Sequence, residues 1–206
     1  MSKPLIALLA LLISACSIGP AAKDAPATYD LGAPRNYSTE QKKIRHGVLV
    51  YNVAAPGWLD SQAIVYRLNY QDAARQLSYA NSRWAAPPAA LLTQRLRSRL
   101  ATVSAGGIIN VADSARADYT LRIELEDFSQ VFDSASTSRA VAVARASIVN
   151  VARRTLHAQK SFAVERAAAN PNAEGGVRAL AAAGDDLIEA VVAWTAESLV
   201  QEKKGN

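Results

Sequence analysis

Residues 119–126 read Tyr-Thr-Leu-Arg-Ile-Glu-Leu-Glu, and this stretch decides the fold. Apolar side chains occupy the odd positions and polar side chains the even ones. This period of two is typical of a β-strand with one face on the core and the other in water. We therefore expect a strand whose apolar face packs on helices and whose Glu124 and Glu126 both point into solvent.

Strand signals recur along the rest of the chain. Residues 48–53 are β-branched and apolar on both faces, which suits a central strand, and Pro56-Gly57 ends it. Residues 140–151 are a further candidate, although their alternate alanines weaken the prediction because alanine favours helix. The other candidates are residues 29–32 at an edge, 63–68, 77–79, 108–111 and 159–164. We expect the three candidates between residues 48 and 79 to form a meander joined by short turns.

Two stretches carry the i, i+3, i+4 spacing of amphipathic helices. The first begins at Pro87-Pro88, since proline is tolerated in the first helical turn, and ends at Gly106-Gly107. Its apolar stripe consists of Leu92, Leu96, Leu100 and Val103. The second runs from residue 173 to about residue 202, and Gly184 inside it permits a kink or close packing.

These elements predict an α+β fold, a mainly antiparallel sheet with two main helices packed on one face. A chain of 206 residues is a natural size for a single domain. Its 50% hydrophobic and 20% charged residues are ordinary for a globular protein, which excludes collagen or a coiled coil as the whole architecture.

The first sixteen residues predict the compartment. Lys3 precedes an unbroken apolar run of nine residues, 5–13, and the small residues Ser14 and Ala15 follow. This pattern indicates a secretory signal peptide, and the run is too short to span a bilayer as a helix. The stretch Ile-Ser-Ala-Cys at 13–16 resembles a bacterial lipobox, which implies cleavage between Ala15 and Cys16 and acylation of Cys16 with fatty acids such as palmitate. A plain signal peptide with an incidental cysteine is the alternative.

The chain is therefore divided into three parts. We expect residues 1–15 to be a lipoprotein signal peptide, residues 16–28 a flexible tether and residues 29–203 a single α+β domain. Ser17 stands where many enteric lipoproteins retained in the inner membrane have aspartate, so the sorting resemblance implies the outer membrane, facing the periplasm. The acyl chains make the membrane a partner. The net charge of +5 is spread without a run of basic residues, and export makes nucleic acid an unexpected partner.

Signatures of catalysis are scarce. A lone cysteine excludes a multi-cysteine zinc site, and neither a Gly-rich phosphate loop nor a GxSxG elbow is present. Glu124 and Glu126 are conceivable as paired carboxylates, but a wet strand face explains them better. His46 and His157 are better explained as surface or turn histidines than as catalytic groups. We expect no enzyme activity, no cofactor and no metal site.

Two short stretches are candidates for contact with a partner or with lipid. Trp58 and Leu59 follow the Pro56-Gly57 turn, where exposure would favour an interface; the alternative is that Trp58 folds back over the sheet edge. Arg95 and Arg99 lie mostly off the apolar stripe of the first helix. They are best explained as solubilising that helix, with contact to anionic head groups or an acidic partner as the second interpretation.

The chain resembles the auxiliary lipoproteins of ABC-type transport systems, the group that contains the paraquat-inducible protein C-like lipoproteins. The resemblance is strongest at Leu77-Ser78-Tyr79-Ala80 and at Arg83-Trp84-Ala85-Ala86-Pro87. It also covers Tyr29-Asp30-Leu31-Gly32, Gly47-Val48-Leu49-Val50, Trp58-Leu59-Asp60, Ile64-Val65-Tyr66-Arg67 and residues 91–100 and 118–132. Because these are structural residues, the resemblance implies no catalytic site, and Trp84 and Pro87 are expected to seat the helix on the sheet.

The resemblance implies a periplasm-facing accessory lipoprotein of an ABC/MCE-type intermembrane lipid transport system. Its expected partner is the MCE-domain protein that bridges the periplasm, which it would dock at the outer membrane. Since rings commonly surround tubular conduits, a homo-oligomer is a further expectation. The alternatives are a lipid-binding carrier, with an enclosed apolar pocket lined by Leu96, Leu100 and Leu187, an envelope hydrolase, or a structural assembly lipoprotein of another envelope complex.

Overall fold

The computed structural model describes residues 25–35 and 44–200. Ala15, Cys16 and the predicted signal peptide lie outside the described residues, as does most of the predicted tether. The strands are β1 (Ala27–Tyr29), β2 (Val48–Val50), β3 (Ala63–Leu68), β4 (Asp72–Trp84), β5 (Ile108–Ile109), β6 (Tyr119–Phe132), β7 (Ser138–Asn150) and β8 (Thr155–Ala167). The helices are α2 (Pro88–Val103) and α3 (Ala173–Val200), with short 3-10 turns η1 (Gly57–Leu59) and η2 (Val111–Asp113).

The predicted α+β fold is confirmed, and its centre is the long antiparallel meander β6–β7–β8. Tyr119 pairs with Asn150 at one end of β6 and Phe132 pairs with Ser138 at the other. The odd positions of residues 119–126 are buried, whereas Glu124 and Glu126 are exposed and both form ion pairs with Arg145. The alternation at residues 119–126 therefore predicted this strand and its wet face correctly.

The predicted meander between residues 48 and 79 is wrong in its first step. β2 does not pair with β3; it lies parallel to both β5 and β6. Only β3 and β4 form the expected antiparallel hairpin, and β3 also runs parallel to the far end of β6. The apolar composition of residues 48–50 fits this position between two strands: Val48 and Val50 lie in the core, and Leu49 is half-buried on the other face.

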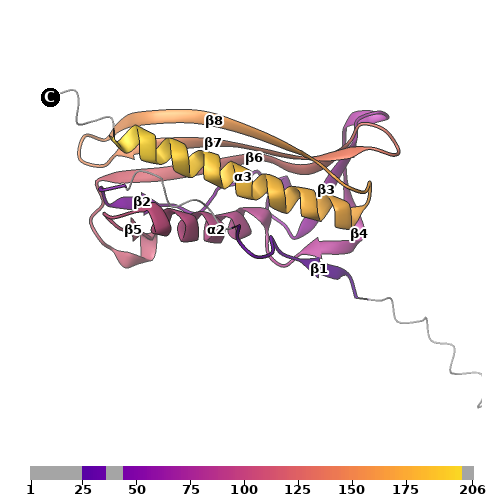
Figure 1. The fold of residues 1–206 in the computed structure, drawn as a ribbon, viewed down its shortest axis with the longest axis horizontal. Coiled ribbons are helices and arrows are strands. Elements are labelled where there is room, and N and C mark those ends of the chain that lie inside the picture. Colours follow the sequence, from indigo (N-terminus) through magenta and orange to yellow (C-terminus); the bar gives the residue numbers. More distant parts are fainter. Residues whose placement is uncertain (1–24, 36–43, 201–206) are drawn as a thin grey trace, which may run out of the picture.

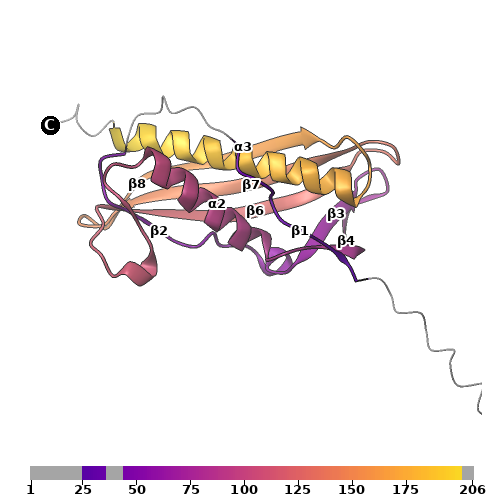
Figure 2. The ribbon, with the colours of Figure 1, turned by 60° about the horizontal axis from the view of Figure 1, so that its bottom comes forward.

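Both helices cover the same face of the sheet, as predicted (Figure 1, Figure 2). The alanines of β7 that weakened its prediction, Ala140, Ala142, Ala144 and Ala146, are all fully buried, on the face that α3 covers. Small side chains there allow the helix to approach the strand closely. Gly184 serves the same purpose between the helices, because a Cβ at this position would lie 3.1 Å from Leu92 Cδ2.

Three predicted boundaries need correction. β4 is thirteen residues long, not only residues 77–79, because its first half carries exposed small and polar side chains that give no apolar alternation. β1 begins at Ala27 and lies parallel to the end of β4, so the last two residues of the predicted tether belong to the folded domain. β8 extends beyond residues 159–164 in both directions. Trp84 is fully buried directly before α2, as its predicted seating role requires.

Candidate functional site

Arg95 and Arg99 are buried, which corrects the prediction that they solubilise α2. Arg95 Nη1 lies 3.1 Å from Asp185 Oδ1 on α3, and both side chains are less than a tenth exposed. Arg99 Nε lies 2.8 Å from Glu189 Oε2 one helical turn further along. The two arginines therefore bind α2 to α3 and do not present charge to head groups or to an acidic partner.

The same charged cluster also holds the segment that follows β1. Arg95 donates to the carbonyl oxygen of Gly32, and Arg35 lies 2.7 Å from Asp186 and 3.7 Å from Asp185. Burial alone would raise the pKa of the Asp186 carboxyl, but the guanidinium groups of Arg166 and Arg35 lower this pKa below its usual range. We call this network the N-terminal clasp: Gly32, Arg35, Arg95, Arg166, Asp185 and Asp186.

Trp58 and Leu59 differ in their environments. Leu59 is 1% exposed in the core, so its predicted availability to a partner is wrong. Trp58 is half-buried and packs against the core, with the Arg67 guanidinium 5.2 Å from the centre of its ring. This is the alternative that we considered for Trp58, in which the indole folds back onto the domain.

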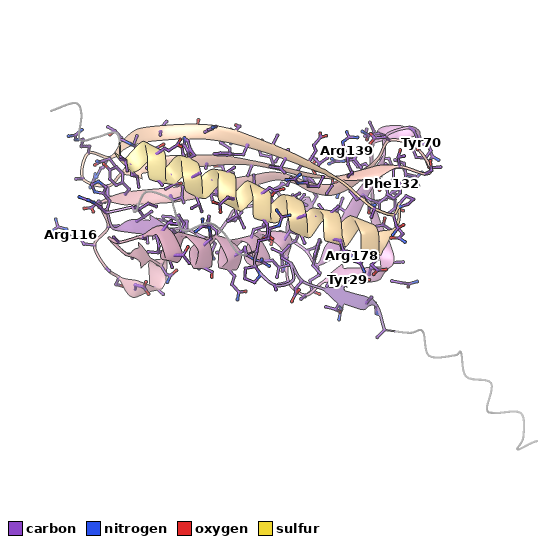
Figure 3. All side chains as sticks on the ribbon, in the orientation of Figure 1. Tyr29, Tyr70, Arg116, Phe132, Arg139 and Arg178 are labelled. Atoms are coloured by element: carbon purple, nitrogen blue, oxygen red, sulfur yellow. The ribbon has the colours of Figure 1, made fainter. Side chains whose placement is uncertain are left out.

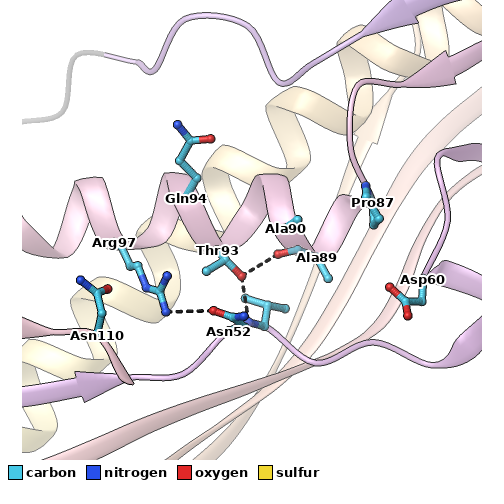
Figure 4. A pocket seen from close by; sticks show the side chains of 10 residues that line it. Asn52, Asp60, Pro87, Ala89, Ala90, Thr93, Gln94, Arg97 and Asn110 are labelled. Atoms are coloured by element: carbon cyan, nitrogen blue, oxygen red, sulfur yellow. Dashed lines mark hydrogen bonds between the residues drawn. The ribbon is translucent and has the colours of Figure 1, made fainter. Parts of the chain in front are cut away.

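A pocket of about 610 Å³ lies beside the first half of α2 (Figure 4). Thr93 Oγ1 accepts a hydrogen bond from the Val53 backbone and donates to the Ala89 carbonyl, which binds the helix to the chain after β2. Arg97 donates to Asn52 Oδ1 and to the Val50 carbonyl. Thr93 and Arg97 therefore use their polar groups to join the helix to β2 and the chain after it, and no nucleophile and base are paired among the lining residues.

The residues proposed for a lipid-carrier cavity form solid core. Leu96, Leu100 and Leu187 are 1%, 0% and 3% exposed and belong to one continuous apolar cluster. None of them lines a pocket described in the structure. The three leucines named for a carrier cavity are therefore packed in the core, and this does not support the carrier hypothesis.

The two histidines, 111 residues apart in sequence, meet at one end of the sheet, which the sequence did not predict. Both rings contact the buried ring of Tyr119, at centroid distances of 5.2 and 5.3 Å. His46 Nδ1 is 3.7 Å from Asp118, and His157 Nε2 is 3.1 Å from the Ser198 carbonyl. Neither imidazole bonds to a serine or threonine hydroxyl in the described residues, so the geometry supports structural roles.

A groove of about 760 Å³ opens at this same end of the sheet, across β2, β6 and β7. It is lined by exposed Tyr51, Val151 and Arg116 together with half-buried Leu49. Figure 3 places Arg116 at the opposite end of the molecule from Tyr29, where the chain enters the sheet. Sequence reasoning missed this groove, because its lining comes from three separate stretches of chain, residues 46–51, 115–120 and 150–152.

Metal binding and membrane spanning find no support in the described residues. Within residues 25–35 and 44–200, His, Cys, Asp and Glu side chains form no group of three or more that could hold a metal ion. No helix in these ranges combines the length and apolarity needed to cross a bilayer.

Solved structures share this fold at low sequence identity. A crystal structure of a protein from Xanthomonas campestris superposes with a TM-score of 0.71 at 18% identity, covering 87% of this chain and 98% of that one. An uncharacterized protein gives a TM-score of 0.62 at 17% identity, covering 84% and 99%. A hypothetical protein from Chlamydia trachomatis gives 0.50 at 9% identity, covering 74% and 97%. These likenesses establish the fold alone.

The chain matches no curated protein sequence. A family match, by contrast, spans residues 29–192, from the end of β1 to well within α3, and so includes both helices and the whole sheet meander. The sequence resemblance is thereby confirmed: the chain belongs to the family of ABC-type transport auxiliary lipoprotein components.

Proposed function

We propose that this lipoprotein is anchored in the outer membrane, faces the periplasm and serves an ABC/MCE-type intermembrane lipid transport system. Its task in this proposal is to dock the periplasm-spanning MCE-domain protein at the outer membrane. The observation that carries the proposal is the family match over residues 29–192, which assigns the chain to ABC transport as an auxiliary component. The lipobox at residues 13–16 supplies the anchor in the proposal.

The N-terminal clasp supports a role in which force on the membrane anchor is passed to the whole domain. Residues that directly follow the proposed tether are held by β1 and by contacts of Gly32 and Arg35 with both helices. Force applied at the acylated Cys16 would therefore be distributed over β4, α2 and α3. It would not simply detach the N-terminal segment from the domain. Such a connection suits a protein that holds a partner in place against a membrane.

The test uses full-length protein extracted from native envelopes in mild detergent. We expect an MCE-domain protein to co-purify, and we expect the extracted chain to lack residues 1–15 and to carry acyl chains on Cys16. A Cys16→Ser variant should leave the outer-membrane fraction while the domain stays folded. Repeated recovery without an MCE-domain protein, or an unmodified amino terminus, contradicts the proposal.

A homo-oligomer is part of the same proposal. The mass of the extracted complex, measured after chemical removal of the partner, gives the number of copies. A single copy per complex contradicts this part and leaves the docking role intact.

A further inference from the structure

The sheet face opposite the helices carries an apolar row at one end. Cross-strand pairing aligns Ile109, Leu49, Thr120, Val149 and Leu156 from β5 through β2, β6 and β7 to β8. Their chain neighbours on the other face, such as Val48 and Ile148, are in the core, so the row points away from both helices. Four spacings between strands make the row about 19 Å long.

This row is partly open to solvent, with Thr120 at its centre 8% exposed. Leu156 is 58% exposed, and Tyr51 and Val151 beside the row are 37% and 42% exposed. Leu49, Ile109 and Val149 are half-buried and give the row a floor. The groove of about 760 Å³ described above runs over Leu49, Thr120 and Val151, so the surface is also hollowed.

Four arginines surround the row. Arg116 lines the groove, Arg122 lies 4.9 Å over the ring of Tyr51, and Arg153 and Arg154 form the turn after β7. Among the described residues, none of these four forms an ion pair with a carboxylate. One carboxylate, that of Asp118, also lines the groove; its Oδ2 accepts a hydrogen bond from the Gly47 backbone and lies 3.7 Å from His46 Nδ1.

The charges decide which occupant this surface suits. An isologous contact with a second copy would place arginines against arginines, which like-charge repulsion opposes. The surface is hollowed over Leu49 and Thr120, and this concave shape suits an inserted protein segment better than the plane of a bilayer. Tyrosine and arginine around an apolar centre are the residues enriched in protein–protein interfaces.

We propose that this surface binds an acidic, amphipathic segment of a protein partner. We call it the arginine-rimmed row: Leu49, Tyr51, Ile109, Val149, Val151, Leu156, Arg116, Arg122, Arg153 and Arg154. Apolar side chains of the segment fill the groove, and its carboxylates meet the four guanidinium groups. The proposal rests on the proposed function and deepens it by naming the surface that meets the MCE-domain protein.

The first experiment places a photo-crosslinking benzoylphenylalanine at position 156 of the full-length protein in native cells. Position 70 is the control, since Tyr70 is 45% exposed at the opposite end of the sheet. We expect a protein adduct from position 156 only, whose crosslinked peptide carries Asp or Glu beside apolar residues. An adduct with a second copy or with phospholipid, a non-acidic peptide, or no adduct overturns the proposal.

The second experiment compares charge-reversed variants in the co-purification described above. Arg122→Glu with Arg153→Glu should reduce the recovered partner by about tenfold or more, because attraction becomes repulsion. Arg75→Glu is the matched control, an exposed arginine of β4 that has no carboxylate partner in the described structure, and should leave recovery unchanged. All of these side chains are exposed, so circular dichroism and the melting temperature should match the wild type.

The outcomes separate this inference from the proposed function. If the MCE-domain protein is recovered equally with the wild type and with the charge-reversed variant, the surface is wrong and the docking function stands. If position 156 crosslinks to an acidic segment of some other protein, the surface stands and the docking function is wrong.

Discussion

Replacing Arg95 by methionine tests whether a buried ion pair holds the two helices together. The substitution keeps most of the aliphatic stem but removes the guanidinium that lies 3.1 Å from Asp185. Asp185 is 4% exposed and cannot recover full hydration where it stands. The Gly32 carbonyl loses its donor at the same time.

The expected loss follows from the burial of both partners. Removing one member of a buried pair costs about 3–5 kcal/mol, because the other charge is left uncompensated. Arg35 still lies 3.7 Å from Asp185, so we expect the lower end, about 3 kcal/mol of unfolding free energy. At about 2–4 °C per kcal/mol for a domain of this size, the melting temperature should fall by about 6–12 °C.

Urea unfolding of the mature chain, followed by circular dichroism, measures this loss. Arg145→Met is the control, because Arg145 pairs with Glu124 on the wet strand face where both side chains are about half exposed. That exposed pair should contribute little, because water screens both charges. The double variant Arg95→Met with Asp185→Leu should regain part of the stability, because no charge is then left unpaired. Equal losses for Arg95→Met and Arg145→Met would refute the reasoning.

Three further changes have expected outcomes. Gly176→Ala would press a Cβ against the side chain of Gln130, which is fully buried and hydrogen-bonded to Tyr79 and Ser138. Thermal melts should therefore show a loss of about 1–3 kcal/mol, where an open helical site gains about 1 kcal/mol from this exchange. Burial, and secondly the charge of Tyr66, raise the pKa of Tyr79 to about 12. Because the unfolded chain then loses the phenol proton at lower pH than the folded chain, the free energy of unfolding should fall from about pH 10 to 12. The fall should be smaller in Tyr79→Phe. The lowered pKa of Asp186 means that its contribution is lost below about pH 4, so acid titration of Asp186→Asn should show a shallower loss.

Local pattern predicted the elements that bury one face. The alternation at residues 119–126 and the helical stripe from Leu92 to Val103 each report a nearby core, and both elements were placed correctly. Only residues 77–79 of β4 were predicted, because the exposed side chains in the rest of the strand follow no apolar alternation. The parallel pairing of β2 with β5 and β6 depends on contacts about 60–70 residues away, which no local pattern encodes.

The prediction that Arg95 and Arg99 are exposed was wrong because their partners lie far away in the sequence. The spacing of charges nevertheless carried a signal. Arg95 and Arg99 are four residues apart on α2, and their partners Asp185 and Glu189 are four residues apart on α3. Matched spacing of opposite charges on two helices predicts a ladder between them, since residues four apart share a helix face. Asp185 also stands inside the apolar stripe of its helix, where an acidic residue is rarely left without a partner.

The arginines on the two faces of the domain differ in whether they are paired with carboxylates. On the helical face, Arg35, Arg95 and Arg99 are neutralised by carboxylates of α3, so this positive charge acts within the chain. At the end of the helix-free face, Arg116 and Arg122 have no such carboxylate in the described residues. A negatively charged partner at Arg35, Arg95 or Arg99 would first have to break an existing ion pair. At Arg116 and Arg122 no ion pair of the described residues has to be broken, so the electrostatic attraction is not reduced by that cost. Attraction to an acidic partner should therefore be strongest at the arginine-rimmed row, whose four arginines form no ion pair with a carboxylate of the described residues.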